Sequence, residues 1–218
     1  MSVSDRQGRL LHIDALVADL APTPTLVGPG VAALCWQLAA GALVFAWFAL
    51  TGGFRPGVLD QLASSPAFAL ESALAVGLAI AAAVGALRLS IPGLGRAPVW
   101  GLAMLALFGL WAGSFALGFV APHVEPSMIG KRPRCYAELL ALGALATLAV
   151  LPLARRRMAL ASRTALAGFA GSGVVWLALA MQLACMYDPW HAFSHHLLPV
   201  VTWVAAAFLV GPRLLPRP

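Results

Sequence analysis

The sequence predicts an all-α integral membrane protein, a six-helix bundle preceded by a short amphipathic helix. Of the 218 residues, 61% are apolar and only 10% are charged, whereas an ordinary soluble domain is about 25% charged. The chain also contains six apolar stretches of about 20 residues, the length that a helix needs to cross a bilayer. These stretches are continuous rather than alternating, which excludes a membrane β-barrel. A disordered chain and a soluble nucleic-acid-binding domain are excluded by the mean hydropathy of +0.88.

The predicted spans follow the uncharged runs of the chain. Residues 31–54 and 97–122 carry no charge and contain the first and third spans. The second span has Glu71 near its start, and the fourth has Glu138 in its first turn. We therefore expect a six-span domain over residues 31–218, with spans at about 31–51, 67–87, 98–120, 135–154, 161–183 and 196–212.

Glu71 and Glu138 are acids within apolar runs, and acids inside a membrane are functional candidates. Both lie within about one helical turn of the outer interface. We therefore expect their side chains to reach lipid headgroups or Arg134. Neither lies near the middle of the bilayer, so the sequence predicts no proton pathway.

Basic residues predict that both ends of the chain are cytoplasmic, because Lys and Arg are concentrated in cytoplasmic segments. An even number of spans places both ends on one side. With the ends inside, the inner segments hold ten basic residues: Arg6, Arg9, Arg88, Arg96, Arg155, Arg156, Arg157, Arg163, Arg213 and Arg217. The outer segments hold four: Arg55, Lys131, Arg132 and Arg134. The cluster at 131–134 runs against this rule.

The N-terminal segment, residues 1–30, contains an amphipathic helix. On a helical wheel its apolar residues share an arc of roughly 120°, and Pro22 and Pro24 end the helix. A helix lying on the membrane is one interpretation. Its polar face is acidic, however, whereas membrane-surface helices are usually basic. A docking helix for a soluble cytoplasmic partner is the sharper hypothesis. The residues expected to bind are Leu10, Ile13, Asp14, Leu16, Asp19 and Leu20.

Two of the three cysteines, Cys135 and Cys185, are predicted at the same membrane depth on the outer side. Antiparallel neighbouring helices would bring them together, and the alternative is two unrelated buried cysteines. The preceding Lys131, Arg132 and Arg134, with the dipole of the helix that begins there, favour a thiolate at Cys135. Cys35, at the opposite end, is expected to be a small core residue.

Histidines follow Cys185 closely. Within twelve residues the chain places Cys185, Asp188, His191, His195 and His196. His191 and His195 are four apart and would share one face of an α-helix, which predicts a zinc or copper site, with His123 and Glu125 in the neighbouring loop. The alternative is that these histidines cap a helix or bond to loop carbonyls. Because no complete ligand motif is present, we expect no resident cofactor and at most a transient metal at His191, His195 and His196.

Taken together, these segments resemble the NrsF family, whose members are negative regulators of an extracytoplasmic-function sigma factor of the sigma F type. The resemblance covers nearly the whole chain in layout. It is carried by the run HIDALVADLAP, the connection RPGVLDQLASSP, the six spans, Cys135 and the stretch from Cys185 to His196.

The resemblance implies an anti-sigma factor in the inner (plasma) membrane of a bacterium. Residues 1–30 would hold the sigma factor at the membrane, without direct contact to nucleic acid. Cys135 and Cys185 match the stress-sensing cysteines of the family, so heavy-metal or oxidative stress is expected to release the sigma factor.

Two other functions are weighed against this one. A membrane thiol-redox protein would usually carry a CxxC motif, which is absent here, and we expect no enzyme activity. A small metal transporter would use Cys185, His191, His195 and His196. It would also need polar groups through the membrane, and Gln37, Ser114 and Gln182 are few and scattered.

Overall fold

The computed structural model describes residues 28–89, 97–157 and 162–215, and every regular element within these ranges is helical. The predicted docking residues Leu10, Ile13, Asp14, Leu16, Asp19 and Leu20 lie outside the described residues. The elements are α2 (Pro29–Thr51), α3 (Val58–Ser64), α4 (Pro66–Leu89), α5 (Ala97–Gly118), α6 (Cys135–Arg157), α7 (Ser162–Ala184), α8 (Pro189–Ala192), a π-helical turn (Phe193–Leu197) and α9 (Leu198–Leu214).

Six of these segments are long and apolar enough to cross a membrane, which confirms the predicted fold class of an all-α multi-pass bundle. They run over Gly30–Thr51, Pro66–Leu89, Val99–Gly118, Cys135–Pro152, Arg163–Ala184 and Pro189–Leu214. The main difference is in the last span, which begins at Pro189 and not at residue 196. The helix starts there because Asp188 caps it and Pro189 occupies its first turn.

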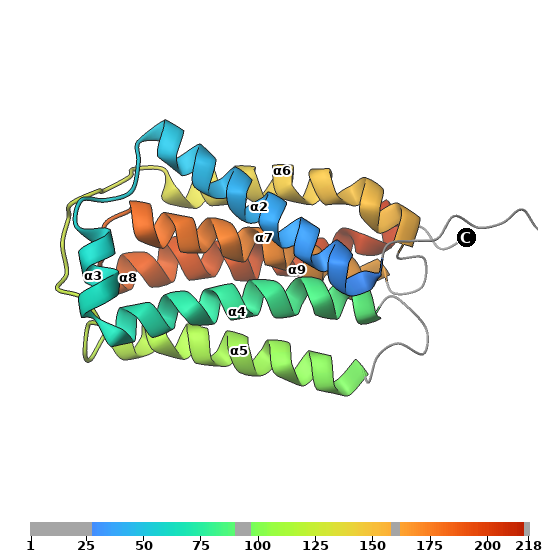
Figure 1. Ribbon diagram of the computed structural model, residues 1–218, viewed down its shortest axis with the longest axis horizontal. Helices are drawn as coiled ribbons and strands as arrows, with labels where there is room; N and C mark the ends of the chain where they lie inside the picture. The colour runs from blue at the N-terminus through green and yellow to red at the C-terminus, as the bar shows by residue number, and fades with distance from the viewer. Residues whose placement is uncertain (1–27, 90–96, 158–161, 216–218) are drawn as a thin grey trace, which may run out of the picture.

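α7 is the central helix of the bundle (Figure 1). Within the protein, 83% of its spanning window is buried, against 17% to 50% for the other spans. It contacts α2, α4, α6 and α9, whereas α5 packs mainly on α4. Small residues permit this close packing: a Cβ on Gly168 would lie 2.7 Å from the Cβ of Ala86.

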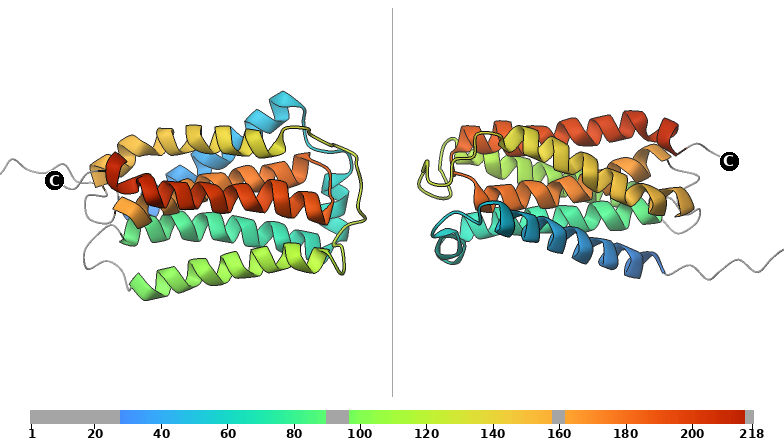
Figure 2. Two further views of the ribbon diagram at one scale, coloured as in Figure 1. Left: turned by 180° about the vertical axis from the view of Figure 1, so that it is seen from behind. Right: turned by 90° about the horizontal axis from the view of Figure 1, so that it is seen from above.

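The two ends of the bundle differ (Figure 2). At one end lie α3, α8 and the connections 52–65, 119–134 and 185–188, and we call this the cysteine end. At the opposite end, α2 begins and α9 ends, so both ends of the described chain lie there. An even number of spans requires this arrangement.

Cys35 departs from its predicted role. Its side chain is exposed on the outer surface of α2, beside the exposed Leu34 and Leu38. The prediction of a core residue is wrong because a hydrophobic run in a membrane does not reveal which face points to lipid.

We expect Gly168→Ala to lower the free energy of unfolding of the detergent-solubilised protein by about 1–3 kcal/mol, and with it the unfolding midpoint. The reason is that the new methyl group overlaps Ala86 and the carbonyl of Ala82. Gly109→Ala is the matched control, since a Cβ on Gly109 meets nothing within 4 Å. Equal unfolding midpoints for the two variants would contradict the assignment of α7 as the tightly packed centre.

Candidate cysteine–histidine site

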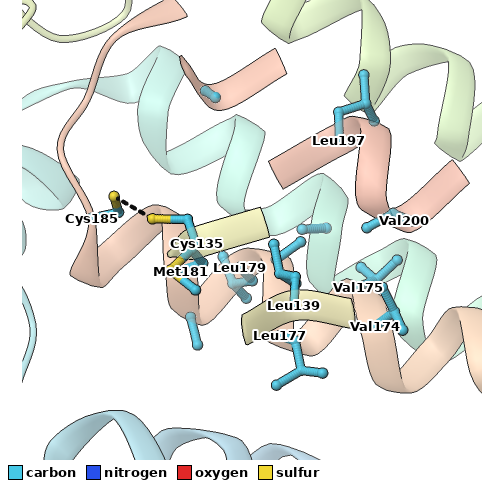
Figure 3. Packing of buried hydrophobic residues seen from close by; sticks show 14 of the residues in the cluster. Cys135, Leu139, Val174, Val175, Leu177, Leu179, Met181, Cys185, Leu197 and Val200 are labelled. Carbon is cyan, nitrogen blue, oxygen red and sulfur yellow. Dashed lines mark hydrogen bonds between the residues drawn. The ribbon is translucent and has the colours of Figure 1, made fainter. Parts of the chain in front are cut away.

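Cys135 and Cys185 meet at the cysteine end. Cys135 is the first residue of α6 and Cys185 directly follows α7. Both side chains are fully buried, and their sulfur atoms lie 3.0 Å apart (Figure 3). A disulfide bond is about 2.05 Å long, so these are two free thiols in contact. The expectation that neighbouring antiparallel helices bring the two cysteines together is confirmed.

His191 joins the pair from α8. Its Nε2 lies 3.2 Å from the sulfur of Cys185. The side chain of Asp188 accepts a hydrogen bond from the backbone N–H of His191, at 2.8 Å, and so fixes the start of this helix. Asp188 therefore positions His191 and does not itself face the sulfur atoms.

A π-helical turn selects the second histidine. In an α-helix, residues four apart share a face, whereas the wider π turn aligns residues five apart. The π turn Phe193–Leu197 lies between His191 and His196, and His196 joins His191 beside the two cysteines. Ligand atoms of Cys135, Cys185, His191 and His196 all lie within 4.8 Å of one another.

His195 shares a helix face with His191 as predicted, but it lies outside this group of four, which corrects its place in the predicted metal site. Its ring stacks on His191 with the centroids 4.3 Å apart, and its Nδ1 lies 2.7 Å from the hydroxyl of Ser194. His123 and Glu125 are not part of the group either: His123 faces Glu71, and Glu125 is exposed.

His196 is 1% exposed. Among the described residues, neither of its ring nitrogens has a hydrogen-bond partner. Buried polar groups in native structures are nearly always satisfied, so an unpaired buried imidazole calls for an explanation.

The surroundings favour a thiolate at Cys185 and not at Cys135. The hydrogen bond from Cys135, followed by that from His191, lowers the pKa of the Cys185 thiol, although burial alone would raise it. The sulfur of Cys135 lies 3.1 Å from the carbonyl oxygen of Arg132, which accepts a hydrogen bond only from a protonated thiol. The predicted thiolate at Cys135 is therefore wrong.

The basic cluster before Cys135 has other contacts. Arg132 donates to the carbonyl of Gly53 at 3.2 Å, lies over the ring of Phe48, and is 3.7 Å from Glu138. Lys131 and Arg134 are exposed. The expected contact of Glu138 with Arg134 is thus replaced by one with Arg132, which ties the start of α6 to the end of α2.

Glu71 does not reach lipid headgroups. It is 1% exposed, accepts a hydrogen bond from the amide of Gln182, and lies 3.3 Å from Nε2 of His123. The expectation from sequence is wrong because α4, α7 and the connection 119–134 close over this carboxyl group.

Arg55 is the residue that sequence reasoning missed. It is 4% exposed, and its Nη1 donates to the carbonyls of Gln182 and Cys185, both at 3.0 Å. These carbonyls end α7, where backbone acceptors have no helical partner. Gln61 accepts two further bonds from the guanidinium, and the rings of Phe68 and Tyr187 flank it.

Arg55 opens the run RPGVLDQLASSP that carries part of the family resemblance, but no sequence signal distinguished its role from that of an ordinary loop charge. Its carbonyl partners belong to residues more than 120 positions away along the chain. Burial lowers the pKa of its guanidinium, and the nearby Tyr187 is the largest of the groups that oppose this shift.

The connection 119–134 packs over the end of α7 and the residues that follow it. The N–H of Ser127 donates to the carbonyl of Tyr187 at 2.9 Å. Gly130 has φ +84°, and a Cβ there would lie 3.0 Å from both the carbonyl oxygen of Ala184 and the Cβ of Arg55. Only glycine fits this conformation and this close approach.

Comparison with known proteins gives one finding. A family model described as NrsF, Negative regulator of sigma F, matches residues 16–216. No curated protein and no solved structure matches the chain.

We expect Arg55→Gln to raise the rate at which a thiol reagent modifies Cys185 by at least about tenfold. Losing charged hydrogen bonds to the last carbonyls of α7 costs about 1.5–3 kcal/mol, which increases local opening accordingly. Peptide mass spectrometry after timed alkylation measures the rate at each cysteine. Arg134→Gln removes an exposed arginine at the same end and serves as the control. An unchanged labelling rate of Cys185 in Arg55→Gln would show that the hydrogen bonds from Arg55 do not hold the end of α7 in place.

Proposed function

Because the chain belongs to the NrsF family of negative regulators of sigma F, we propose that it is a membrane-anchored anti-sigma factor for an extracytoplasmic-function sigma factor. The family match over residues 16–216 carries this proposal, since it includes all six candidate spans. The chain is then a regulator and not an enzyme. Its task is to hold the sigma factor at the inner membrane, away from RNA polymerase.

The distribution of exposed charge supports cytoplasmic chain ends. At the opposite end from the cysteines, Arg88, Arg155, Arg163 and Arg213 are exposed. At the cysteine end, Arg55 is buried and Arg132 is engaged with backbone and aromatic groups. Only Lys131 and Arg134 are exposed basic residues in the described part of that end. Two of the four basic residues at this end are therefore engaged within the protein, and the positive-inside rule favours the proposed orientation.

We place sigma-factor binding at the amphipathic N-terminal segment. The family match includes Leu16, Asp19 and Leu20 and begins after Leu10, Ile13 and Asp14. The described chain starts at Gly28, at the end of the bundle opposite the cysteines. A helix immediately before α2 would emerge on the side where a cytoplasmic partner is available. The apolar face then fits a groove on the sigma factor, and the aspartates favour a basic rim.

The proposed stress signal acts on Cys135 and Cys185. A peroxide would convert the two contacting thiols into a disulfide with release of water, and a thiophilic metal would bind both sulfurs. Either event changes how the start of α6 sits against the end of α7. Moving the bound fraction of sigma factor from 99:1 to 1:99 takes about 5.5 kcal/mol, which is within the free energy of thiolate–metal binding and of the same order as the stabilisation by a disulfide.

α2 offers a physical link from this site to the N-terminal segment. In the middle of the bundle the amide of Gln37 on α2 donates to the hydroxyl of Ser172 on α7 at 2.9 Å. It also donates to the carbonyl of Ala79 on α4 at 2.6 Å. A displacement of α7 is therefore transmitted to α2. The same bonds satisfy Gln37 inside the bundle, which weakens the metal-transporter alternative.

We expect the sigma factor to co-purify with the intact chain from unstressed membranes in mild detergent, and to be lost when residues 1–22 are deleted. Leu16→Glu with Leu20→Glu disrupts the apolar face and should abolish recovery. Ala15→Glu lies on the opposite face of the wheel and is the matched control. Undiminished recovery of the sigma factor with the double variant would overturn the docking proposal.

We expect replacement of both Cys135 and Cys185 by Ser to abolish induction of sigma-dependent transcription by cadmium or peroxide. Transcript levels before and after exposure measure the response. Cys35→Ser changes the exposed cysteine on α2 and should respond as the unmodified chain does. Normal induction in the double variant would refute sensing by this pair.

A further inference from the structure

We propose that Cys135, Cys185, His191 and His196 form a four-ligand site for one thiophilic divalent cation, Zn²⁺ or Cd²⁺. Only the regulatory consequence of this site rests on the proposed function. Metal binding itself depends on these four side chains alone. The site extends the cysteine pair by two histidine ligands and defines a stoichiometry of one ion per chain.

The spacing of the ligand atoms suits a tetrahedral ion. Bonds of about 2.3 Å to sulfur and about 2.0 Å to nitrogen place tetrahedral ligands about 3.3–3.8 Å apart. The sulfur atoms lie 3.0 Å apart, the nearer histidine nitrogen is 3.2 Å from Cys185, and all four atoms fall within 4.8 Å. Accommodating an ion requires the two sulfurs to separate by about 1 Å. The short turn 185–188 and the first turn of α6 carry that movement.

His196 is the independent observation that points to a ligand. It is 1% exposed and presents ring nitrogens without a hydrogen-bond partner in the described part of the chain. Coordination of an ion would give one of these two nitrogens a partner. The π turn Phe193–Leu197, which contains His196, is an uncommon geometry that occurs frequently at functional sites.

Charge balance also favours this ion class. Binding breaks two S–H bonds and forms two metal–sulfur bonds, which releases two protons, or one where Cys185 is already a thiolate. Two thiolates and two neutral imidazoles around a divalent ion give a neutral complex, which a buried site tolerates. The acids at this end have other partners: Asp188 accepts from the backbone N–H of His191, Glu71 faces His123, and Glu138 faces Arg132. Two sulfur and two nitrogen ligands select Zn²⁺ or Cd²⁺ over Mg²⁺ and Ca²⁺, which prefer oxygen.

The site makes metal binding and oxidation mutually exclusive. A Cys135–Cys185 disulfide uses both sulfur atoms and leaves only the two imidazoles. A bound ion in turn protects both sulfurs from peroxide. The two stresses therefore converge on one cluster through competing chemistry.

The test uses the full chain in detergent, stripped of metal and kept reduced by a phosphine. Titration with Cd²⁺, followed by thiolate-to-cadmium absorption in the ultraviolet, should give one ion per chain. His191→Ala and His196→Ala should each weaken binding at least about tenfold, the lower bound found even for outer-shell partners of metal ligands. His195→Ala, a neighbouring histidine outside the group, should bind within about threefold of the unmodified chain, well short of that tenfold loss.

X-ray absorption on the unmodified, Zn²⁺-loaded chain removes any dependence on variant folding. We expect two sulfurs at about 2.3 Å and two nitrogens at about 2.0 Å. Equal affinities for His196→Ala and His195→Ala, a sulfur–oxygen shell, or no binding by the unmodified chain would overturn the site.

Sigma-factor capture by the same His196→Ala variant separates the two proposals. Retained capture with weakened metal binding supports the site as a sensor distinct from the docking segment. If the unmodified chain captures the sigma factor but binds no metal, the metal site is refuted and oxidation of the two cysteines is the sensing chemistry that remains. Failure of capture by the unmodified chain refutes the anti-sigma proposal while the metal titration still decides the site.

Discussion

The cysteine end depends on how the last carbonyls of α7 are satisfied. α7 is the most buried span, so its final acceptors end within protein and not in water. Arg55 supplies the donors, and its guanidinium at the same time organises α3 through Gln61. Cys185 is one of the two residues whose backbone carbonyl accepts a hydrogen bond from Arg55. The position of the reactive sulfur is therefore a consequence of how a membrane helix is capped.

Around that cap the protein assembles groups that a lipid environment would otherwise exclude. Glu71 is paired with Gln182 and His123, and the connection 119–134 is held down at Ser127 and Gly130. Polar groups are tolerated here because each one faces another and none faces lipid. His196 differs from Glu71 and Gln182 because neither of its ring nitrogens has a hydrogen-bond partner among the described residues, which is why it draws attention as a ligand.

The cysteine–histidine cluster and the start of α2 lie at opposite ends of the bundle, whose helices α6 and α7 each contain 23 residues and span about 34 Å. A signal over this distance requires rigid elements that move as units. α6 and α7 meet at the two sulfurs, and α7 is bonded to α2 through Gln37 and Ser172. α2 continues towards the N-terminal segment. The bundle thus contains a continuous set of contacts from the cysteine end to α2.

Hydropathy alone determined the all-α class, the number of spans and the shared membrane depth of Cys135 and Cys185, because burial in lipid is a local and additive property of the chain. Tertiary structure decided what local patterns do not encode. Cys35 faces outward because packing, not apolarity, selects the face of a helix. Arg55 caps α7 through partners more than 120 residues away. His196, and not His195, lies beside the cysteines, because a π turn changes the angular spacing along the helix at this point.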